Sequence, residues 1–244
     1  MDCDKEYLFT IEWGSSTASQ DKEGEVIARS DVRPNKSEIE AVLPSFIGDI
    51  QQVPPKYSAI KVDGERAYDL ARDGESFEIP SREVTVYEAE LMAVPDADHA
   101  VFRVVSGKGF YIRALARDLA EALGAEGHVS QLRRTRVGAM SEADAVTLQA
   151  LEDLAERKDA LFETLLTLET VLDDVPKLSI EPRDAAAIIQ GREFTLMPHL
   201  LEQWRAEATS GTLDRMALTV CDGDAVALGE VRAGRFQPKK VFQL

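Results

Sequence analysis

The stretch Gly107–Gly124, GKGFYIRALARDLAEALG, does most to decide the fold of this 244-residue chain. It predicts an amphipathic helix from about Tyr111 to Leu123, because apolar residues recur at intervals of three and four and a glycine follows. The inner stripe consists of Ile112, Leu115, Ala116, Leu119 and Leu123. Arg113 and Arg117 are four residues apart, so they share the outer face of this helix.

The segments on either side predict strands. Residues 6–14 alternate between apolar and polar side chains, which is typical of a strand with one buried face. That face carries Tyr7, Phe9, Ile11 and Trp13. Residues 84–86, 101–105 and 129–137 predict further strands, so the chain belongs to the α+β class.

Three other segments complete the first part of the chain. A short helix disturbed at Pro44 begins with Ser37, which we expect to form a capping box with Glu40. Residues 51–64 contain two consecutive prolines and predict an extended, exposed loop. Residues 148–172 predict one acidic helix.

A change of composition at Val175-Pro176 predicts a separate C-terminal module. Its last third contains short apolar runs, 218–221, 226–231 and 241–242, separated by turns at Asp222-Gly223 and Ala233-Gly234. We therefore expect two domains, residues 1–175 and 176–244.

Composition excludes several classes of protein. No apolar run approaches the roughly 20 residues that span a bilayer, and the first residues do not form a secretory leader, so we expect a cytoplasmic protein without membrane contact. Two distant cysteines and three scattered histidines predict neither a disulfide framework nor a metal site. No nucleotide-binding motif is present, so we expect no cofactor. The residues concerned are Cys3, Cys221, His99, His128 and His199.

The distribution of charge is more informative than its sum. The formal net charge is −16, which by itself argues against a nucleic-acid partner. Residues 104–140, however, hold six Lys and Arg against three acidic residues. An acidic body with such a local basic stripe can still steer a polyanion into one groove.

Three stretches occur in an order and spacing that carry a resemblance: VPPKYSAIKVDGERAYDLARDG (53–74), GKGFYIRALARDLAEALG (107–124) and HVSQLRRTRVG (128–138). Together they resemble the TruB family of bacterial tRNA pseudouridine-55 synthases. The resemblance implies a pseudouridine synthase fold, with a mixed or antiparallel sheet and flanking helices. It also implies a thumb-like RNA-binding segment at about residues 53–80 and a β-rich, PUA-like RNA-binding domain at 176–244. The implied partner is the T-arm of tRNA, bound by a monomer.

The resemblance implies catalytic roles for three residues. Such an enzyme breaks the N-glycosidic bond of uridine and rejoins the base through carbon, so the base must leave the RNA stack and enter a pocket. Tyr7 matches the tyrosine that stacks on the base, although its spacing fits a core residue equally well. Arg133 matches the arginine that pairs with the catalytic carboxylate, a role suited to the guanidinium fork. Asp21 matches an acid beside the pocket.

Further residues match RNA-contacting positions of the family. For those around residue 110, helix capping and packing explain the pattern about as well as RNA contact does. For the arginines after Arg133, phosphate contact or a solvated face is the expected role. The candidate RNA-binding residues are Lys56, Tyr57, Lys61, Arg66, Lys108, Tyr111, Arg113, Arg134 and Arg136.

The chain also departs from the family pattern. The nucleophilic aspartate of the family lies in a Gly-Thr-Leu-Asp-Pro motif before the strand that contains Tyr7, and this sequence starts after that point. We therefore expect a chain that lacks its N-terminal catalytic segment and binds T-arm RNA without isomerising uridine 55 by itself. Gln131 replaces the aromatic or small residue expected there.

Two other functions compete with this one. A catalytically dead tRNA-binding or tRNA-folding protein could use the same groove. An acidic protein-interaction module fits less well, because it leaves the ordered basic motifs unexplained.

A second Gly-Thr-Leu-Asp run, Gly211–Asp214, raises the possibility of a displaced nucleophile. Arg215 replaces the proline of the motif, and the run leads into the predicted strands of the C-terminal module. We therefore expect Asp214 to be a surface residue and Asp214→Asn to leave folding and tRNA affinity unchanged.

Overall fold

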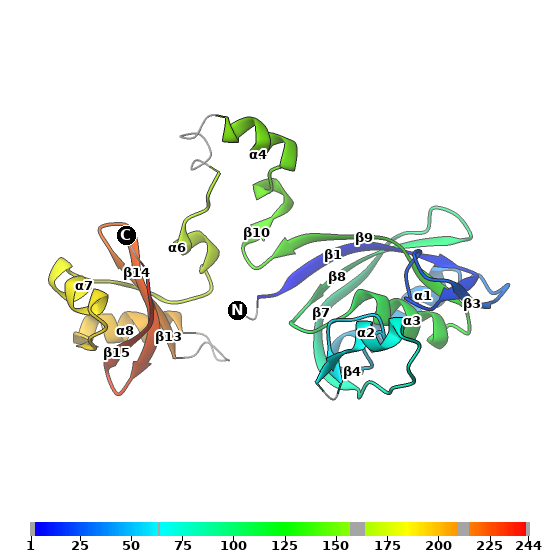
Figure 1. Ribbon diagram of the computed structural model, residues 1–244, viewed down its shortest axis with the longest axis horizontal. Coiled ribbons are helices and arrows are strands. Elements are labelled where there is room, and N and C mark those ends of the chain that lie inside the picture. Colours follow the sequence, from blue (N-terminus) through cyan, green and yellow to red (C-terminus); the bar gives the residue numbers. More distant parts are fainter. Residues whose placement is uncertain (1–2, 63, 157–163, 209–214, 243–244) are drawn as a thin grey trace. The chain divides into compact units, whose positions relative to one another are not determined.

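The computed structural model describes residues 3–62, 64–156, 164–208 and 215–242. The chain divides into two compact units, Met1–Asp144 and Ala145–Leu244 (Figure 1). The boundary at residue 144 is earlier than the domain boundary expected at residue 175, because the intervening segment groups with the C-terminal unit. The expected division at 175 stays a prediction.

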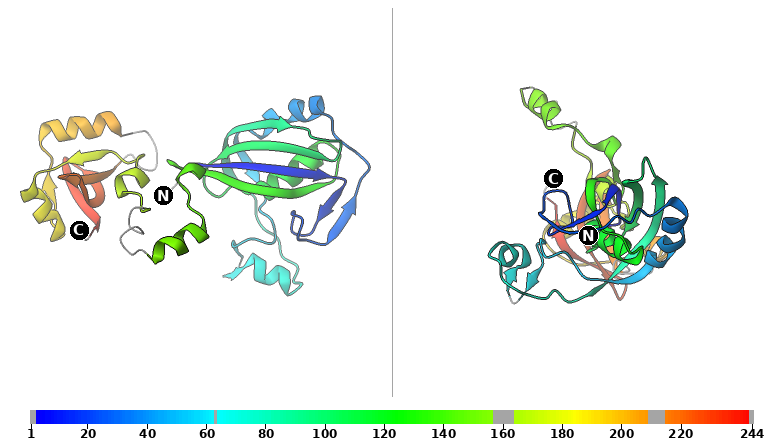
Figure 2. Two further views of the ribbon diagram at one scale, coloured as in Figure 1. Left: turned by 90° about the horizontal axis from the view of Figure 1, so that it is seen from above. Right: turned by 90° about the vertical axis from the view of Figure 1, so that its right-hand side faces the viewer.

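A six-stranded antiparallel sheet forms the frame of the first unit, with the strand order β10-β9-β1-β8-β7-β4 (Figure 2). The central strand β1 pairs with β8 on one side and with β9 on the other. The strands are β1 (Lys5–Trp13), β4 (Gly48–Gln52), β7 (Arg82–Ala93), β8 (His99–Ser106), β9 (Gly127–Val137) and β10 (Met140–Ser141). A short hairpin of β2 (Ser15–Thr17) and β3 (Val26–Arg29) follows β1.

Only one face of this sheet is covered. Phe9, Ile11 and Trp13 point to the covered face and are buried, whereas the alternate residue Leu8 is 41% exposed. The helix α3 (Ile112–Ala122) lies on the covered face and buries Leu115 and other stripe residues in the main core. The shorter α1 (Lys36–Val42) and the 3-10 helix η1 (Leu43–Phe46) contribute to the same core. The predicted strand alternation and the predicted helix are therefore confirmed.

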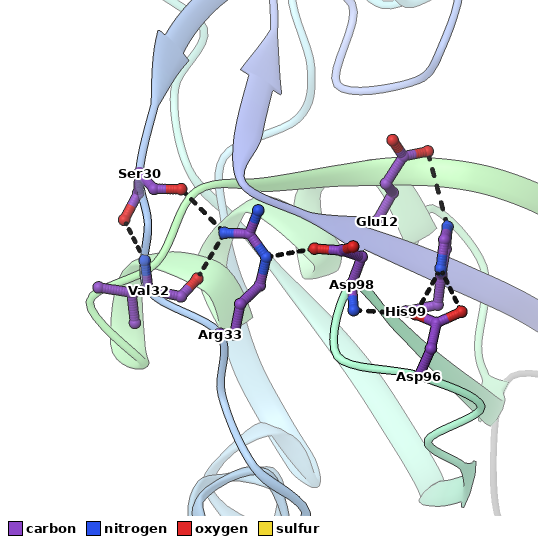
Figure 3. A network of polar contacts seen from close by, with 7 residues as sticks. All are labelled: Glu12, Ser30, Val32, Arg33, Asp96, Asp98 and His99. Atoms are coloured by element: carbon purple, nitrogen blue, oxygen red, sulfur yellow. Dashed lines mark hydrogen bonds and ion pairs between the residues drawn. The ribbon is translucent and has the colours of Figure 1, made fainter.

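A polar network closes one end of the sheet (Figure 3). The Arg33 guanidinium donates from Nε to Asp98 Oδ1 at 2.5 Å, which ties the segment after β3 to the turn between β7 and β8. In the same turn, Asp96 Oδ1 lies 2.8 Å from His99 Nδ1. On the other side of His99, its Nε2 lies 3.9 Å from Glu12 Oε2. These contacts fix the path of the chain as it leaves β3.

The segment after β4 leaves the body of the first unit and carries the small hairpin β5 (Lys61–Val62) and β6 (Glu65–Arg66), followed by α2 (Ala67–Arg72) (Figure 2). The extended, exposed loop expected for residues 51–64 is only partly correct. Gln52, Pro54 and Pro55 at the root of the segment are buried, because they lie against the unit that the segment leaves.

The C-terminal unit contains a five-stranded mixed sheet with the order β11-β13-β14-β15-β12. Its strands are β11 (Lys177–Ser179), β12 (Phe194–Thr195), β13 (Met216–Cys221), β14 (Asp224–Arg232) and β15 (Arg235–Val241). The helices α7 (Pro182–Ile189) and α8 (Pro198–Glu207) pack on the core of this sheet through Ile188 and Leu200. The expected α+β class, with a small β-rich C-terminal part, is confirmed.

Two local predictions were wrong. The capping box of α1 joins Asn35 and Glu38 instead of Ser37 and Glu40, so the helix begins two residues earlier than expected. The single helix expected for residues 148–172 is interrupted: among the described residues of this range, α4 (Leu148–Ala155) and α6 (Leu168–Val171) are helical and residues 165–167 are not. Each begins at a threonine, Thr147 or Thr167, whose hydroxyl accepts a backbone N–H three residues later.

Candidate functional site

An ion pair between Asp21 and Arg113 lies at the centre of the candidate site. Arg113, in the first turn of α3, donates from Nη1 to Asp21 Oδ2 at 3.1 Å and to the Ser19 carbonyl at 2.9 Å. Its Nη2 donates to the Tyr57 carbonyl at 2.7 Å. The Arg113 side chain is 22% exposed, so these contacts are partly shielded from solvent. One guanidinium therefore joins α3, the loop after β2 and the root of the 53–80 segment.

The carboxylate of Asp21 has donors on both oxygens. Besides the Arg113 contact on Oδ2, Oδ1 accepts the Ser19 hydroxyl at 2.5 Å and the Glu23 backbone N–H at 3.1 Å. Donors on both oxygens fix the orientation of the carboxylate. This carboxylate is suited to orienting other groups and less suited to attacking a substrate.

Two clefts lie beside this ion pair. Asp21 and Arg113 line the smaller cleft, of about 470 Å³, together with Leu132 and the adjacent residues of β9. Gln20 and Tyr57 line the larger cleft, of about 840 Å³, which extends along the 53–80 segment. Both volumes lie within the usual range of ligand pockets.

Tyr7 and Arg133 lie on opposite faces of the sheet. Paired residues of antiparallel strands share a face. Tyr7 pairs with Arg134, whereas Arg133 pairs with Leu8 on the uncovered face. The Arg133 side chain is 73% exposed and contacts Glu142. The structure therefore does not bring Arg133 to Tyr7, and the predicted pairing of Arg133 with a pocket carboxylate is not supported by its position.

Tyr7 itself is half-buried and packs against the main core. It lies on the covered face of the sheet, the same face that carries α3 and therefore Arg113. On this face, the arginine that forms an ion pair with an acidic residue, Asp21, is Arg113. We had expected Arg113 to contact RNA or to pack.

A side chain that the sequence did not single out holds the start of α3. Gln52, at the end of β4, has no exposed surface. Its Nε2 donates to the Tyr111 carbonyl at 3.2 Å, and the Tyr111 N–H donates to its Oε1 at 2.9 Å. Arg82, the register partner of Gln52 on β7, contacts the Gly109 carbonyl and lies 5.1 Å from the centre of the Tyr111 ring.

The predicted RNA-binding residues of the 53–80 segment are all accessible. Lys56 and Tyr57 line the larger cleft. Lys61 and Arg66 face each other across the β5–β6 hairpin and are exposed. The Tyr57 ring meets the ring of Tyr68 edge-on at 6.1 Å between centres. Arg72 also lies over the Tyr68 ring, at 5.6 Å.

The other predicted RNA-binding residues lie on the sheet and the loop before α3. Lys108 and Arg134 are exposed, and Tyr111 is half-buried. Arg136 is half-buried and donates to the Gly138 carbonyl at 3.1 Å, so it stabilises the turn after β9. Gln131 is exposed and lines the smaller cleft.

One predicted feature lies outside the part of the chain that the structure describes. Asp214 and the run that contains it lie outside the described residues. Within the described ranges, no three His, Cys, Asp or Glu side chains are arranged to hold a metal ion. In the same part of the chain, no helix is both long enough and apolar enough to cross a membrane.

The sequence matches two family models of pseudouridylate synthases. Residues 1–112 match the N-terminal domain of TruB family pseudouridylate synthase, and residues 113–173 match the C-terminal domain of tRNA pseudouridylate synthase B. The crystal structure of a Cbf5-Nop10-Gar1 complex contains a similar fold, with a TM-score of 0.67 and 22% identity. That similarity covers 98% of this chain and 67% of the other.

Curated relatives are similar over the whole sequence. The tRNA pseudouridine synthase B of Caulobacter vibrioides is 51% identical over 244 residues, which is 100% of this chain and 78% of that protein. The enzyme of the same name from Rhizobium johnstonii is 45% identical and covers 99% of this chain and 77% of that protein. The chain belongs to the TruB family of pseudouridylate synthases.

Proposed function

We propose that the protein is a tRNA pseudouridine synthase that acts on uridine 55 in the T-arm. The observation that carries this proposal is the Asp21–Arg113 pair in the smaller cleft, in a chain whose relatives are named tRNA pseudouridine synthase B. We place this activity in the cytoplasm, where tRNA is found, and we propose that the protein acts as a monomer, as the resemblance to the family implies.

In this proposal Tyr7, Arg113 and Asp21 each have a separate role. Tyr7 holds the extruded base on its ring, since base-flipping enzymes bind their target between aromatic or apolar side chains. Arg113 takes the role that we first assigned to Arg133 and orients the nucleophilic carboxylate that the family's Gly-Thr-Leu-Asp-Pro segment supplies. Asp21 holds the Arg113 guanidinium at the correct position. No cofactor is required, because the base is detached and rejoined to the same ribose.

The 53–80 segment binds the RNA backbone in this proposal. Its cations and tyrosines lie along the larger cleft or on the adjacent hairpin, where phosphates and bases of a single-stranded loop would be within reach. The C-terminal residues 176–244 add a second, PUA-like RNA contact. The end of strand β14 and strand β15 carry four basic residues, Arg232, Arg235, Lys239 and Lys240.

The competing function is tRNA binding or folding without chemistry. One experiment separates the two, using a tRNA transcript labelled with tritium at C5 of uridine. Isomerisation joins C5 to the ribose and releases its hydrogen, so tritium appears in water only if the base is turned. A transcript with uridine 55 replaced by cytidine is the control.

The tritium assays use the chain with the family's Gly-Thr-Leu-Asp-Pro segment placed before residue 1, and the expected result is tight, salt-sensitive binding of the T-arm together with tritium release that depends on uridine 55. The 244 residues without that segment are expected to bind the T-arm and to release no tritium. Binding without release by the extended chain would favour the tRNA-binding alternative. Absence of preferential T-arm binding would contradict both.

A further inference from the structure

We infer that Gln52 is a positioning residue that fixes Arg113 by holding the first residue before α3. This inference rests on the proposed function of the Arg113 pocket. It concerns a residue that contacts no substrate in the proposed mechanism and acts through the helix.

The first support is the chemistry of the Gln52 side chain. A buried amide has two donors and an acceptor that must find partners, or folding is penalised. Gln52 is fully buried, and its amide pairs with both the N–H and the carbonyl of Tyr111. The Gln52 amide therefore makes the two hydrogen bonds that a neighbouring antiparallel strand would make with the extended backbone of Tyr111.

The second support is the weak capping of α3. Its N-cap residue is Tyr111, whose side chain makes no capping hydrogen bond with the helix. The first backbone N–H groups of a helix have no partner within the helix, so the start of a helix without a cap is free to shift or fray. Gln52 and its register partner Arg82 hold this start from the sheet, at Tyr111 and Gly109 respectively.

The third support is the position of the residues that follow Gln52 and Tyr111 in the chain. Arg113 is two residues after Tyr111 and donates to the Tyr57 carbonyl. Arg117, one turn later, donates from Nη2 to the Val53 carbonyl at 2.9 Å. Gln52 therefore sets the position of α3 against the root of the 53–80 segment. By fixing the position of α3, Gln52 also keeps Arg113 within hydrogen-bonding distance of Asp21 and of the Tyr57 carbonyl.

The test uses the full chain and two variants of matched chemistry. Gln52→Met keeps the shape of the side chain and removes both hydrogen bonds. Thr219→Val is the control, because Thr219 is also fully buried and its hydroxyl makes the same pair of contacts, with the Ala227 carbonyl and N–H, each at 3.1 Å. Thr219 lies in the C-terminal unit, has no exposed surface and is not among the basic residues that we propose contact RNA there.

Both variants are expected to unfold at lower temperature, so affinity for a T-arm hairpin is measured well below either transition. Gln52→Met should bind about tenfold more weakly, as expected for the loss of about one charge-assisted contact at Arg113. Thr219→Val should bind as the wild type does. Equal affinity of Gln52→Met and the wild type would overturn the inference.

A third variant, Gln52→Glu, adds a readout that a general loss of stability does not produce. The protonated carboxyl can accept from the Tyr111 N–H and donate to the Tyr111 carbonyl, whereas the ionised form cannot donate. Burial raises the pKa of the introduced carboxyl. The affinity of the Gln52→Glu variant for the T-arm hairpin, relative to that of the wild type, should therefore fall between about pH 5.5 and about pH 8.5. A constant ratio over this range would contradict the inference.

If the wild type shows no preference for the T-arm, that result rejects the proposed function and leaves the role of Gln52 to be tested separately. Amide hydrogen exchange provides this separate test. Gln52→Met should speed exchange in the first turn of α3 and in residues 53–58, and Thr219→Val should not. Unchanged exchange in these two segments would reject the inference.

Discussion

Replacing Arg113 by lysine is the most direct test of the pocket. The arginine makes contacts at two separate nitrogens, Nη1 with Asp21 and Ser19, and Nη2 with the Tyr57 carbonyl. Lysine keeps the charge but concentrates it at a single ammonium, which cannot occupy both positions. Arg113→Lys therefore loses at least one charge-assisted hydrogen bond.

The size of the effect follows from these contacts. A hydrogen bond to a charged group contributes about 1.5–3 kcal/mol, and the lower value applies because the side chain keeps some exposure. Each 1.4 kcal/mol corresponds to about tenfold in an equilibrium or rate ratio. We expect Arg113→Lys to weaken T-arm binding, and to slow tritium release from the labelled tRNA, by about tenfold or more.

Arg133→Lys is the matched control. Arg133 is 73% exposed, and its partner Glu142 is also exposed. Such surface pairs contribute at most about 1 kcal/mol, so this variant should bind and react within a few-fold of the wild type. Equal losses in the two variants, or a larger loss for Arg133→Lys, would refute the assignment of the pocket arginine to Arg113.

Four further variants test the pocket and the two units. Tyr7→Phe should keep T-arm affinity and slow tritium release, whereas Tyr7→Ala should reduce both; an unchanged Tyr7→Ala would exclude stacking on this ring. The hydrogen bond from Thr135, together with Arg103, lowers the pKa of Glu6, so this contribution to stability is present above the usual pKa of a glutamate and is lost as the pH falls through the lowered value. Thr135→Val should therefore cost about 1 kcal/mol in urea unfolding at neutral pH and much less at about pH 3, and an equal cost at both pH values would argue against this coupling. Gly229→Ala should lower the melting temperature of the C-terminal unit, because the added Cβ would lie 2.4 Å from the Gln237 carbonyl oxygen; no change in melting temperature would contradict that packing.

The periodicity of the sequence predicted the elements that are amphipathic. Phe9, Ile11 and Trp13 follow a period of two and are buried together, and Leu115 and Leu119 follow the helical period and are buried below them. In each case a single apolar face requires one orientation, which the sequence therefore determines.

The sequence could not determine which arginine enters the pocket. The face of Arg133 depends on its register with β1, and that pairing is irregular at two places, between Glu6 and Tyr7 and between Thr10 and Ile11. An extra residue in one strand shifts the facing of every side chain beyond it. Residues 133–136 are almost all polar, so no apolar alternation indicates their facing.

Gln52 was missed for a different reason. A glutamine before two prolines is typical of an exposed turn, and nothing local indicates that its amide is buried. Its partner Tyr111 is 59 residues away in the chain, so only the folded sheet brings the two together.

The edge of β9 that faces away from β1 has a consequence for solubility. Among the described residues, this side pairs with the loop at Asp21 near Val129 and with β10 at Arg136 and Val137. Between these points no strand in the described part of the chain pairs with the backbone edge of residues 131–135. Such an edge is a template for pairing with another copy of a protein and for aggregation. Arg133 and Arg134 lie on this edge, exposed, one on each face of the strand. Like charges brought together by edge-to-edge pairing of two copies would repel, so the two arginines protect the protein from self-association through this strand.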